Sequence, residues 1–161
     1  MQQQKVVLAY SGGLDTSFCV KYLSEEKQLE VHAVMVDTGG FSADDLAAAQ
    51  ARAKDLGVHH FTVIDAKADY YQNCLRYLIY GNVLRNQTYP LCVSAERMFQ
   101  ALAVVKYANR IGATHVAHGS TGAGNDQVRF DLAFNILGKD LTILTPIRDL
   151  QLSRQAEIDY L

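Results

Sequence analysis

Short apolar runs alternate with helical patterns along this 161-residue chain, and the alternation constrains its fold more than any other feature. Five runs are predicted to be strands: Lys5–Tyr10, Val31–Asp37, His59–Ile64, Thr114–His118 and Leu141–Leu144. Helices are predicted at Thr16–Lys27, Leu46–Leu56, Ala66–Leu84, Ser94–Ile111 and Gln127–Leu137. Wholly apolar strands separated by helices are typical of a parallel sheet with helices on both faces. We predict an α/β fold with a doubly wound five-stranded parallel sheet in the usual order 3-2-1-4-5.

The composition narrows the possible classes of protein. Hydrophobic residues make up 49% of the chain and charged residues 20%, which is ordinary for one globular domain, here residues 1–161. The formal net charge of −2 disfavours a nucleic acid as main partner. No apolar run approaches the ~20 residues that span a bilayer, and no signal peptide is recognisable. Three separated cysteines, Cys19, Cys74 and Cys92, fit a reducing compartment. We expect a cytoplasmic protein.

The stretch SGGLDTS, from Ser11 to Ser17, joins the first predicted strand to the first predicted helix. Glycines before a helix let an anion approach the backbone N–H groups of its first turn, where the helix dipole favours negative charge. The loop lacks the lysine with which a Walker A loop binds the γ-phosphate. It is therefore better suited to hold pyrophosphate as a leaving group. The alternative is a plain tight turn with a Ser, Thr or Asp cap.

A second glycine-rich stretch, HGSTGAGNDQVR, follows the fourth predicted strand at His118–Arg129. In the predicted order the chain changes direction across the sheet between strands one and four, so both loops would face one crevice. Thr121 and Asn125 can hydrogen-bond an α-carboxylate. Asp126 can pair with an α-ammonium, and Arg129 offers a planar fork for a carboxylate. The alternative is a glycine turn with an Asx cap.

The motifs together resemble one family. SGGxD[ST] is the pyrophosphate-loop signature of enzymes that activate a substrate oxygen with the α-phosphate of ATP. AYSGGLDTS, HGSTGAGNDQVRF and TPIRD further resemble the patterns of the argininosuccinate synthase family. The resemblance implies an adenine-nucleotide α-hydrolase-like fold and an ATP-dependent carbon–nitrogen ligase of arginine biosynthesis and the urea cycle. Such a ligase joins citrulline to aspartate through citrullyl-AMP and releases AMP and pyrophosphate.

The family's chains are well over twice this length, with a second, synthetase domain and a C-terminal segment that assembles a homotetramer. The resemblance therefore implies that residues 1–161 are the N-terminal nucleotide-binding domain of a longer chain. The helical pattern Ser153–Leu161 fits this expectation, because it stops without an end signal. We expect such a piece to bind ATP but to turn over poorly.

The resemblance also assigns site residues position by position. ATP binding is implied for Ala9, Tyr10, Ser11, Gly12, Gly13, Leu14, Asp15, Thr16, Ser17, Val36 and Gly119. Aspartate binding is implied for Thr121, Asn125 and Asp126, and citrulline binding for Tyr89, Ser94, Asn125 and Arg129. Catalytic roles are expected for Asp15, Asp126 and Arg129, acting by positioning and charge stabilisation. Mg²⁺ is the expected companion of ATP, with no side chain assigned to it.

Some positions depart from the family pattern or leave alternatives open. Ala123 stands where the family usually has a lysine, and Val36-Asp37 replaces a small residue followed by Asn, so only a backbone contact with adenine would survive at Val36. His118 is either a general base or a structural strand-end histidine. The rival functions are another pyrophosphate-loop enzyme that uses ATP and a non-catalytic nucleotide-binding module.

Overall fold

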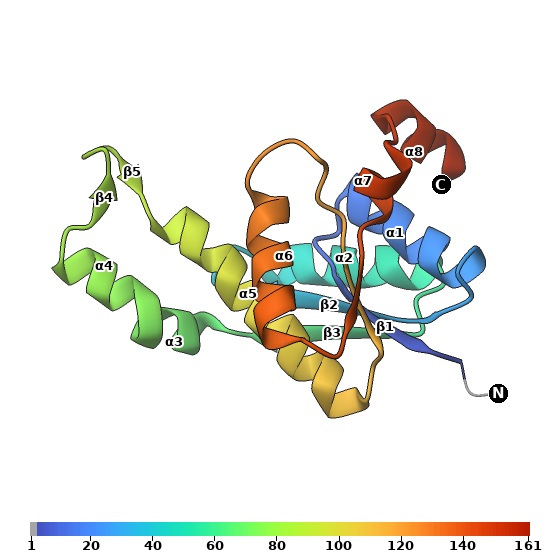
Figure 1. The fold of residues 1–161 in the computed structure, drawn as a ribbon, viewed down its shortest axis with the longest axis horizontal. Coiled ribbons are helices and arrows are strands. Elements are labelled where there is room, and N and C mark those ends of the chain that lie inside the picture. The colour runs from blue at the N-terminus through green and yellow to red at the C-terminus, as the bar shows by residue number, and fades with distance from the viewer. Residues whose placement is uncertain (1–2) are drawn as a thin grey trace.

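The side chains of β1 (Lys5–Ala9) alternate between two hydrophobic cores, one on each face of a sheet. In the computed structural model, which describes residues 3–161, Val6 and Leu8 enter one core and Val7 enters the other, all fully buried. Side chains along a strand point alternately to opposite faces, so a strand that is apolar throughout needs helices on both sides. Figure 1 shows these layers around the central strands.

The main sheet has five parallel strands in the order β3-β2-β1-β6-β7. The other strands are β2 (Glu30–Asp37), β3 (His60–Asp65), β6 (His115–His118) and β7 (Thr142–Leu144). Because β6 and β7 are the fourth and fifth strands of this sheet, the predicted order is confirmed. Ala9 pairs with Val34 on one side and with His118 on the other, so β1 and β6 end together at the switch point while β2 continues to Asp37.

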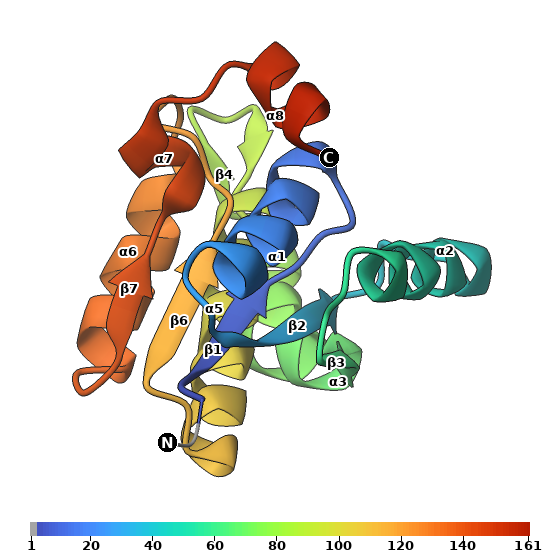
Figure 2. The ribbon, with the colours of Figure 1, turned by 90° about the vertical axis from the view of Figure 1, so that its right-hand side faces the viewer.

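Two pairs of helices cover the two faces of the sheet. The first pair, α1 (Leu14–Glu25) and α2 (Ala43–Asp55), packs on the core that contains Val6. The second pair, α5 (Cys92–Ile111) and α6 (Asp126–Leu137), packs on the core that contains Val7. Figure 2 shows α1 and α5 on opposite sides of β1. The fold is therefore the doubly wound arrangement that the sequence predicts.

The chain returns to α1 after the last strand of the sheet. Two short helices follow β7, α7 (Pro146–Leu150) and α8 (Arg154–Tyr160). The ring of Tyr160 packs 4.8 Å from that of Phe18, and Lys21 Nζ donates to the Tyr160 carbonyl at 2.8 Å. These contacts fix α8 beside the helix that follows the first glycine loop.

A narrow arm projects from the α5 side of the sheet (Figure 1). It consists of α3 (Lys67–Tyr70), one π-helical turn (Tyr71–Leu75), α4 (Arg76–Tyr80) and the antiparallel pair β4 (Leu84–Arg85) and β5 (Tyr89–Pro90). The predicted helix Ala66–Leu84 is wrong at its end, because the helix stops at Tyr80 and Leu84 lies in β4. Gly81 and Asn82 turn the chain there, Asn82 with a φ of 45°.

Within residues 3–161, no helix combines the length and the apolar character needed to cross a membrane.

Candidate functional site

The first glycine loop forms a small cradle at the start of α1. Gly12 has a φ of 77°, and a Cβ there would lie 3.2 Å from the Ala49 Cβ of α2. Ser11 Oγ accepts a hydrogen bond from Gly13 N at 3.3 Å, and Thr16 Oγ1 donates to the Gly13 carbonyl at 3.2 Å. Gly13 begins the helix without any side-chain cap. No side chain of the protein therefore caps the N–H groups of the first turn, which is the arrangement that suits an anion.

A cavity of about 710 Å³ opens between the two glycine loops, at the carboxyl ends of β1, β2 and β6. Nine of the eleven predicted ATP residues line it: Ala9, Tyr10, Ser11, Gly13, Leu14, Asp15, Thr16, Val36 and Gly119. Its apolar wall includes Val34 and Val104, and its polar wall includes Arg97 and Arg154. A concave site with an apolar wall and a few polar groups, at a switch point, is the expected form of a small-molecule site.

Two of the predicted ATP residues, Gly12 and Ser17, lie outside the lining of this cavity. The Ser17 side chain is buried at 3% exposure, on the face of α1 that packs on the sheet. Asp37, next to Val36, is also buried and accepts hydrogen bonds from Lys67 Nζ at 2.6 Å and Gly39 N at 2.8 Å. The hydrogen bond from Lys67 lowers the pKa of Asp37, so this residue is a carboxylate held by α3.

The second glycine loop touches the first where Gly119 passes the start of α1. A Cβ on Gly119 would lie 3.0 Å from Thr16 Cγ2 and 3.2 Å from the Thr16 backbone nitrogen. The same addition at Gly122 would meet nothing closer than 4.0 Å. Two backbones approach closely at Gly119, so a side chain there would press on the start of α1, whereas position 122 has room for a side chain.

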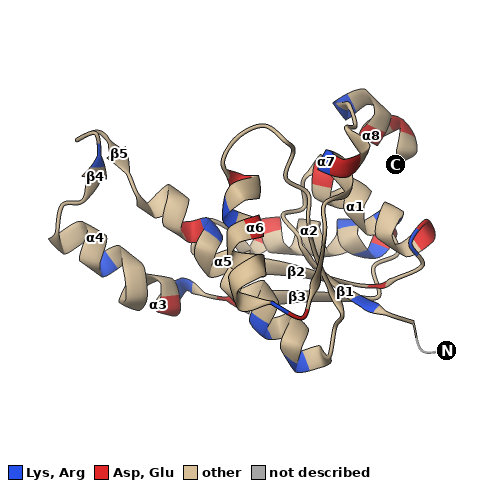
Figure 3. Cartoon of the chain, viewed as in Figure 1, with Lys and Arg blue, Asp and Glu red and all other residues tan. Residues whose placement is uncertain are grey.

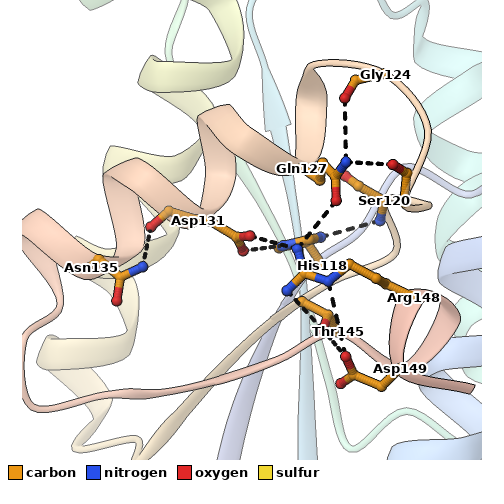
Figure 4. Close-up of polar contacts among 10 residues, drawn as sticks. His118, Ser120, Gly124, Gln127, Asp131, Asn135, Thr145, Arg148 and Asp149 are labelled. Carbon is orange, nitrogen blue, oxygen red and sulfur yellow. Dashed lines mark hydrogen bonds and ion pairs between the residues drawn. The ribbon is translucent and has the colours of Figure 1, made fainter.

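A chain of polar contacts fixes the second loop and the helix that follows it (Figure 4). Asp131 of α6 accepts hydrogen bonds from His118 Nε2 at 2.9 Å and from Arg148 Nη1 at 2.5 Å. The same Arg148 nitrogen donates to Gln127 Oε1 at 3.3 Å, and Gln127 Nε2 donates to the Gly122 carbonyl at 2.6 Å. Arg148 of the TPIRD motif thus holds the second glycine loop in place through its hydrogen bonds to Asp131 and Gln127.

The contacts of His118 favour the structural role among the two alternatives left open by the sequence, and the ring also lines the first cavity. Ser120 N–H donates to its Nδ1 at 3.2 Å, so Nε2 carries the proton and donates to Asp131. The ring is 1% exposed and stacks on Phe130 with centroids 5.4 Å apart. Burial lowers the pKa of His118 against the opposing effect of Asp131, which keeps the ring neutral. Both ring nitrogens are occupied by the protein itself.

The start of α6 brings together residues predicted to bind the two amino acids. Asp126 pairs with Arg129 Nη1 at 2.6 Å and with Arg97 Nε of α5 at 3.2 Å. Arg129 Nη2 also donates to Ser94 Oγ at 3.4 Å. Figure 3 shows acidic and basic segments of α5 and α6 side by side at this point. The predicted carboxylate and guanidinium ligands are thus held in one ion-pair cluster.

A second cleft of about 440 Å³ lies between the β4–β5 arm and α6. Three of the predicted citrulline residues line it, Tyr89, Asn125 and Arg129. The predicted aspartate residues Thr121 and Asp126 line the first cavity instead. The Asp126–Arg129 ion pair connects the two clefts, because its two partners line different ones.

Asp15 lies beside an acidic residue from the end of the chain. Glu157 of α8 is only 2% exposed, and burial, followed by the nearby Asp15 carboxylate, raises its pKa. Glu157 therefore keeps its proton more readily than an exposed glutamate does, which reduces the repulsion between the two acidic side chains. Sequence reasoning missed Glu157 because only the tertiary fold brings α8 to α1.

Three arginines near the site were also missed by the sequence reasoning. Arg52 of α2 donates from Nη1 to the Gly12 carbonyl, while Arg97 and Arg154 line the first cavity. Each lies in an ordinary helical pattern, far along the chain from the glycine motifs, so local sequence gives no signal for it. These three arginines bring positive charge to the site, whereas this chain has Ala123 at the position where the family pattern usually has a lysine.

The fold and the site define a doubly wound α/β domain with two glycine loops at its switch point. The chain matches the family described as "Arginosuccinate synthase N-terminal HUP domain" over residues 5–161, and it belongs to that family. Argininosuccinate synthases from Dictyoglomus thermophilum and Pyrobaculum aerophilum are 42% and 45% identical to it over 161 residues. These matches cover 99% of this chain and 40% of each relative, so the chain spans well under half their length.

Among solved structures, an NH3-dependent NAD synthetase from Campylobacter jejuni is similar in fold. The TM-score is 0.54 at 21% sequence identity, over 75% of this chain and 49% of the other. At this identity the likeness concerns the fold alone, and it agrees with the predicted adenine-nucleotide α-hydrolase-like class.

Proposed function

We propose that this chain is the nucleotide-binding domain of an argininosuccinate synthase, the ligase that joins citrulline to aspartate with ATP. One observation carries the proposal. Both glycine loops, with the motifs that resemble the family, line a single cavity at the switch point of the sheet. Family membership and relatives of that name at 42% and 45% identity support it.

The first loop would hold the phosphates of ATP. The uncapped start of α1 offers backbone N–H groups, and the hydroxyls of Ser11 and Thr16 add donors. Arg97 and Arg154 supply positive charge along the same cavity. Apolar side chains of β2 and α5, including Val36, suit the faces of an adenine ring.

Mg²⁺ would accompany the nucleotide. It prefers oxygen ligands and usually binds through one or two carboxylates plus substrate phosphates. Asp15 and Asp126 both line the cavity, but Asp126 is paired with two arginines, so Asp15 is the better candidate. When bound, the ion would neutralise part of the charge on the phosphates.

The second loop and the arm would hold the two amino acids. Asp126 would exchange its arginine partners for the ammonium group of aspartate, and Thr121 would bond the carboxylate of the same substrate. Arg129, between Ser94 and the second cleft, would bind the carboxylate of citrulline. Asn125, which lines the second cleft with Tyr89, would contact both substrates.

In the proposed reaction, the ureido oxygen of citrulline attacks the α-phosphorus of ATP. A new P–O bond forms as the bond to pyrophosphate breaks, which gives citrullyl-AMP. The amine of aspartate then forms the C–N bond and displaces AMP. The protein's part is to hold three substrates in line and to stabilise the charge on the leaving groups.

We further propose the wider setting that the family resemblance implies. The chain would be the N-terminal domain of a longer synthase that forms homotetramers in the cytoplasm and serves arginine biosynthesis or the urea cycle. By itself it would bind ATP but turn over poorly, because a crevice closed on one side admits water and weakens charge stabilisation. Neither nucleic acid nor membrane would be a partner.

Pyrophosphate release with citrulline, aspartate and Mg-ATP tests the proposed activity, measured on the longer synthase that contains this chain. Substituting Asp126→Ala should raise the KM for aspartate far more than the KM for ATP. Asp140→Ala is the matched control, because Asp140 lines neither cleft. Pyrophosphate release that needs no citrulline would contradict the assignment, and equal rises in both KM values would contradict the role of Asp126.

A further inference from the structure

A cluster of possible metal ligands lies at the amino ends of the strands, opposite the nucleotide cavity. Glu30 and His32 are two residues apart on β2, and His60 on β3 is the register partner of His32. Side chains two residues apart on a strand share a face, and so do register partners. The fold therefore brings a carboxylate and two imidazoles together. Their ligand atoms all lie within 4.8 Å of one another.

We propose that Glu30, His32 and His60 form a binding site for a divalent transition-metal ion of the zinc class. Zinc bonds of about 2.0–2.1 Å in a tetrahedral site put neighbouring ligand atoms roughly 3.4 Å apart. Glu30 Oε1 lies 2.9 Å from His32 Nε2 and 3.8 Å from His60 Nε2, so small side-chain movements reach this geometry. Two imidazoles and one carboxylate suit zinc better than magnesium or calcium.

The surroundings of His32 suit a metal ligand. Its Nδ1 lies 3.3 Å from the Tyr107 hydroxyl, which lies 3.3 Å from Thr62 Oγ1. Because both hydroxyls can donate or accept, this chain of contacts can reverse direction. Nδ1 can then become the donor to Tyr107 while Nε2 gives its lone pair to the metal. Metal-bound histidines usually have such a partner on the other ring nitrogen.

One basic side chain lies near the site. The positive charge of Lys5 acts on the Glu30 carboxylate and opposes the binding of a cation. The Lys5 ammonium donates to the Ile111 carbonyl at 3.4 Å, outside the cluster.

Access to the site comes from the side of His60. The His60 side chain is 60% exposed, whereas that of His32 is 7% exposed. A metal here would have three protein ligands and one position open to water, as in zinc sites with incomplete protein coordination. It would tie β3, an edge strand, to β2. The expected effect is stabilisation of the fold by zinc, independent of ATP.

Calorimetry with ZnCl2 tests this proposal, on the chain prepared without a histidine tag and treated with a chelator. We expect one site per chain. Substituting Tyr107→Phe removes the outer partner of His32 and should weaken binding about 10- to 100-fold. Substituting His60→Ala removes a ligand and should weaken it more. His115→Ala is the matched control, since His115 lies on β6, beyond β1, and should leave the affinity unchanged.

Two further readouts keep the test independent of folding in any one variant. Co²⁺ should give the intense visible absorption of a low-coordinate site in the parent chain and lose it in His60→Ala, whose exposed side chain contributes little to folding. Zinc should raise the melting temperature of the parent but not of Glu30→Gln. Zinc binding of equal affinity in the parent and in His60→Ala, or no saturable binding by the parent, would overturn the proposal.

Discussion

The two clefts of this protein are built from different kinds of structure. The first rests on the ends of three buried strands and on helices that the two cores hold in place. The second rests on a projecting arm whose two strands have only two residues each. Tyr89, which lines the second cleft, is 44% exposed, whereas Val36 and His118 in the first are almost fully buried. The walls of the first cleft are therefore held by the two cores of this chain, whereas one wall of the second is formed by the exposed arm.

The largest expected difference between the two regions concerns stability. Phe134 is fully buried and packs against Phe130 and His118 behind the first cavity. Substituting Phe134→Ala should cost about 3–5 kcal/mol of unfolding free energy. Substituting Tyr89→Ala in the arm should change it by no more than about 0.5 kcal/mol. Urea denaturation measures both, and similar losses would contradict the contrast.

The hydroxyl of Ser11 should matter strongly for ATP. It is expected to hydrogen-bond a charged phosphate, so Ser11→Ala should cost roughly 1.5–3 kcal/mol of binding free energy. That loss corresponds to about a 10- to 150-fold weaker Kd. Ser24→Ala, at the far end of α1, is the matched control. Calorimetry on folded variants measures the affinity, and an unchanged Kd in Ser11→Ala would remove the first loop from the account.

The two glycines of the second loop should differ. A Cβ at position 119 would press on the start of α1, and overpacking costs about 1–3 kcal/mol. Gly119→Ala should therefore weaken ATP binding and lower stability, because it shifts the phosphate cradle. Gly122→Ala is the internal control, with room for the added methyl group. Equal effects of the two substitutions on the Kd would show that the loops do not meet as described.

His118 should add a pH-dependent part to the stability of the first region. The pKa of His118 is lower in the folded state than in the unfolded chain, where a histidine has its ordinary pKa of about 6.5. As the pH falls below about 6.5, the unfolded chain therefore binds more protons than the folded chain does. The contribution is present above about pH 6.5 and is lost as the pH falls below it. The pKa values of His32 and His115 are lowered too. The contribution of His118 is therefore the difference in unfolding free energy between the parent and His118→Gln, measured as a function of pH. Identical pH profiles of unfolding would contradict it.

The sequence predicted the part of the molecule that local patterns determine. Apolar runs predicted the strands, and the usual order of doubly wound sheets predicted their arrangement. Nine of the eleven residues that the motifs assign to ATP line one cavity. It missed what only the tertiary fold brings together. Glu157 lies close to Asp15 although the two residues are far apart in the sequence. Arg52, on α2, donates a hydrogen bond to the Gly12 carbonyl. The arm was misread because its apolar residues continue a helical pattern past Gly81.

One measurement compares the two clefts directly: the melting temperature of the 161-residue chain with Mg-ATP and, separately, with citrulline. ATP at about 100 times its Kd should stabilise the chain by roughly 2.7 kcal/mol, which raises the melting temperature by about 2–4 °C per kcal/mol. Citrulline at the same concentration should give little or no shift, because its predicted ligands lie on the second cleft, beside the exposed arm. No shift with ATP, or a comparable shift with citrulline alone, would contradict the account.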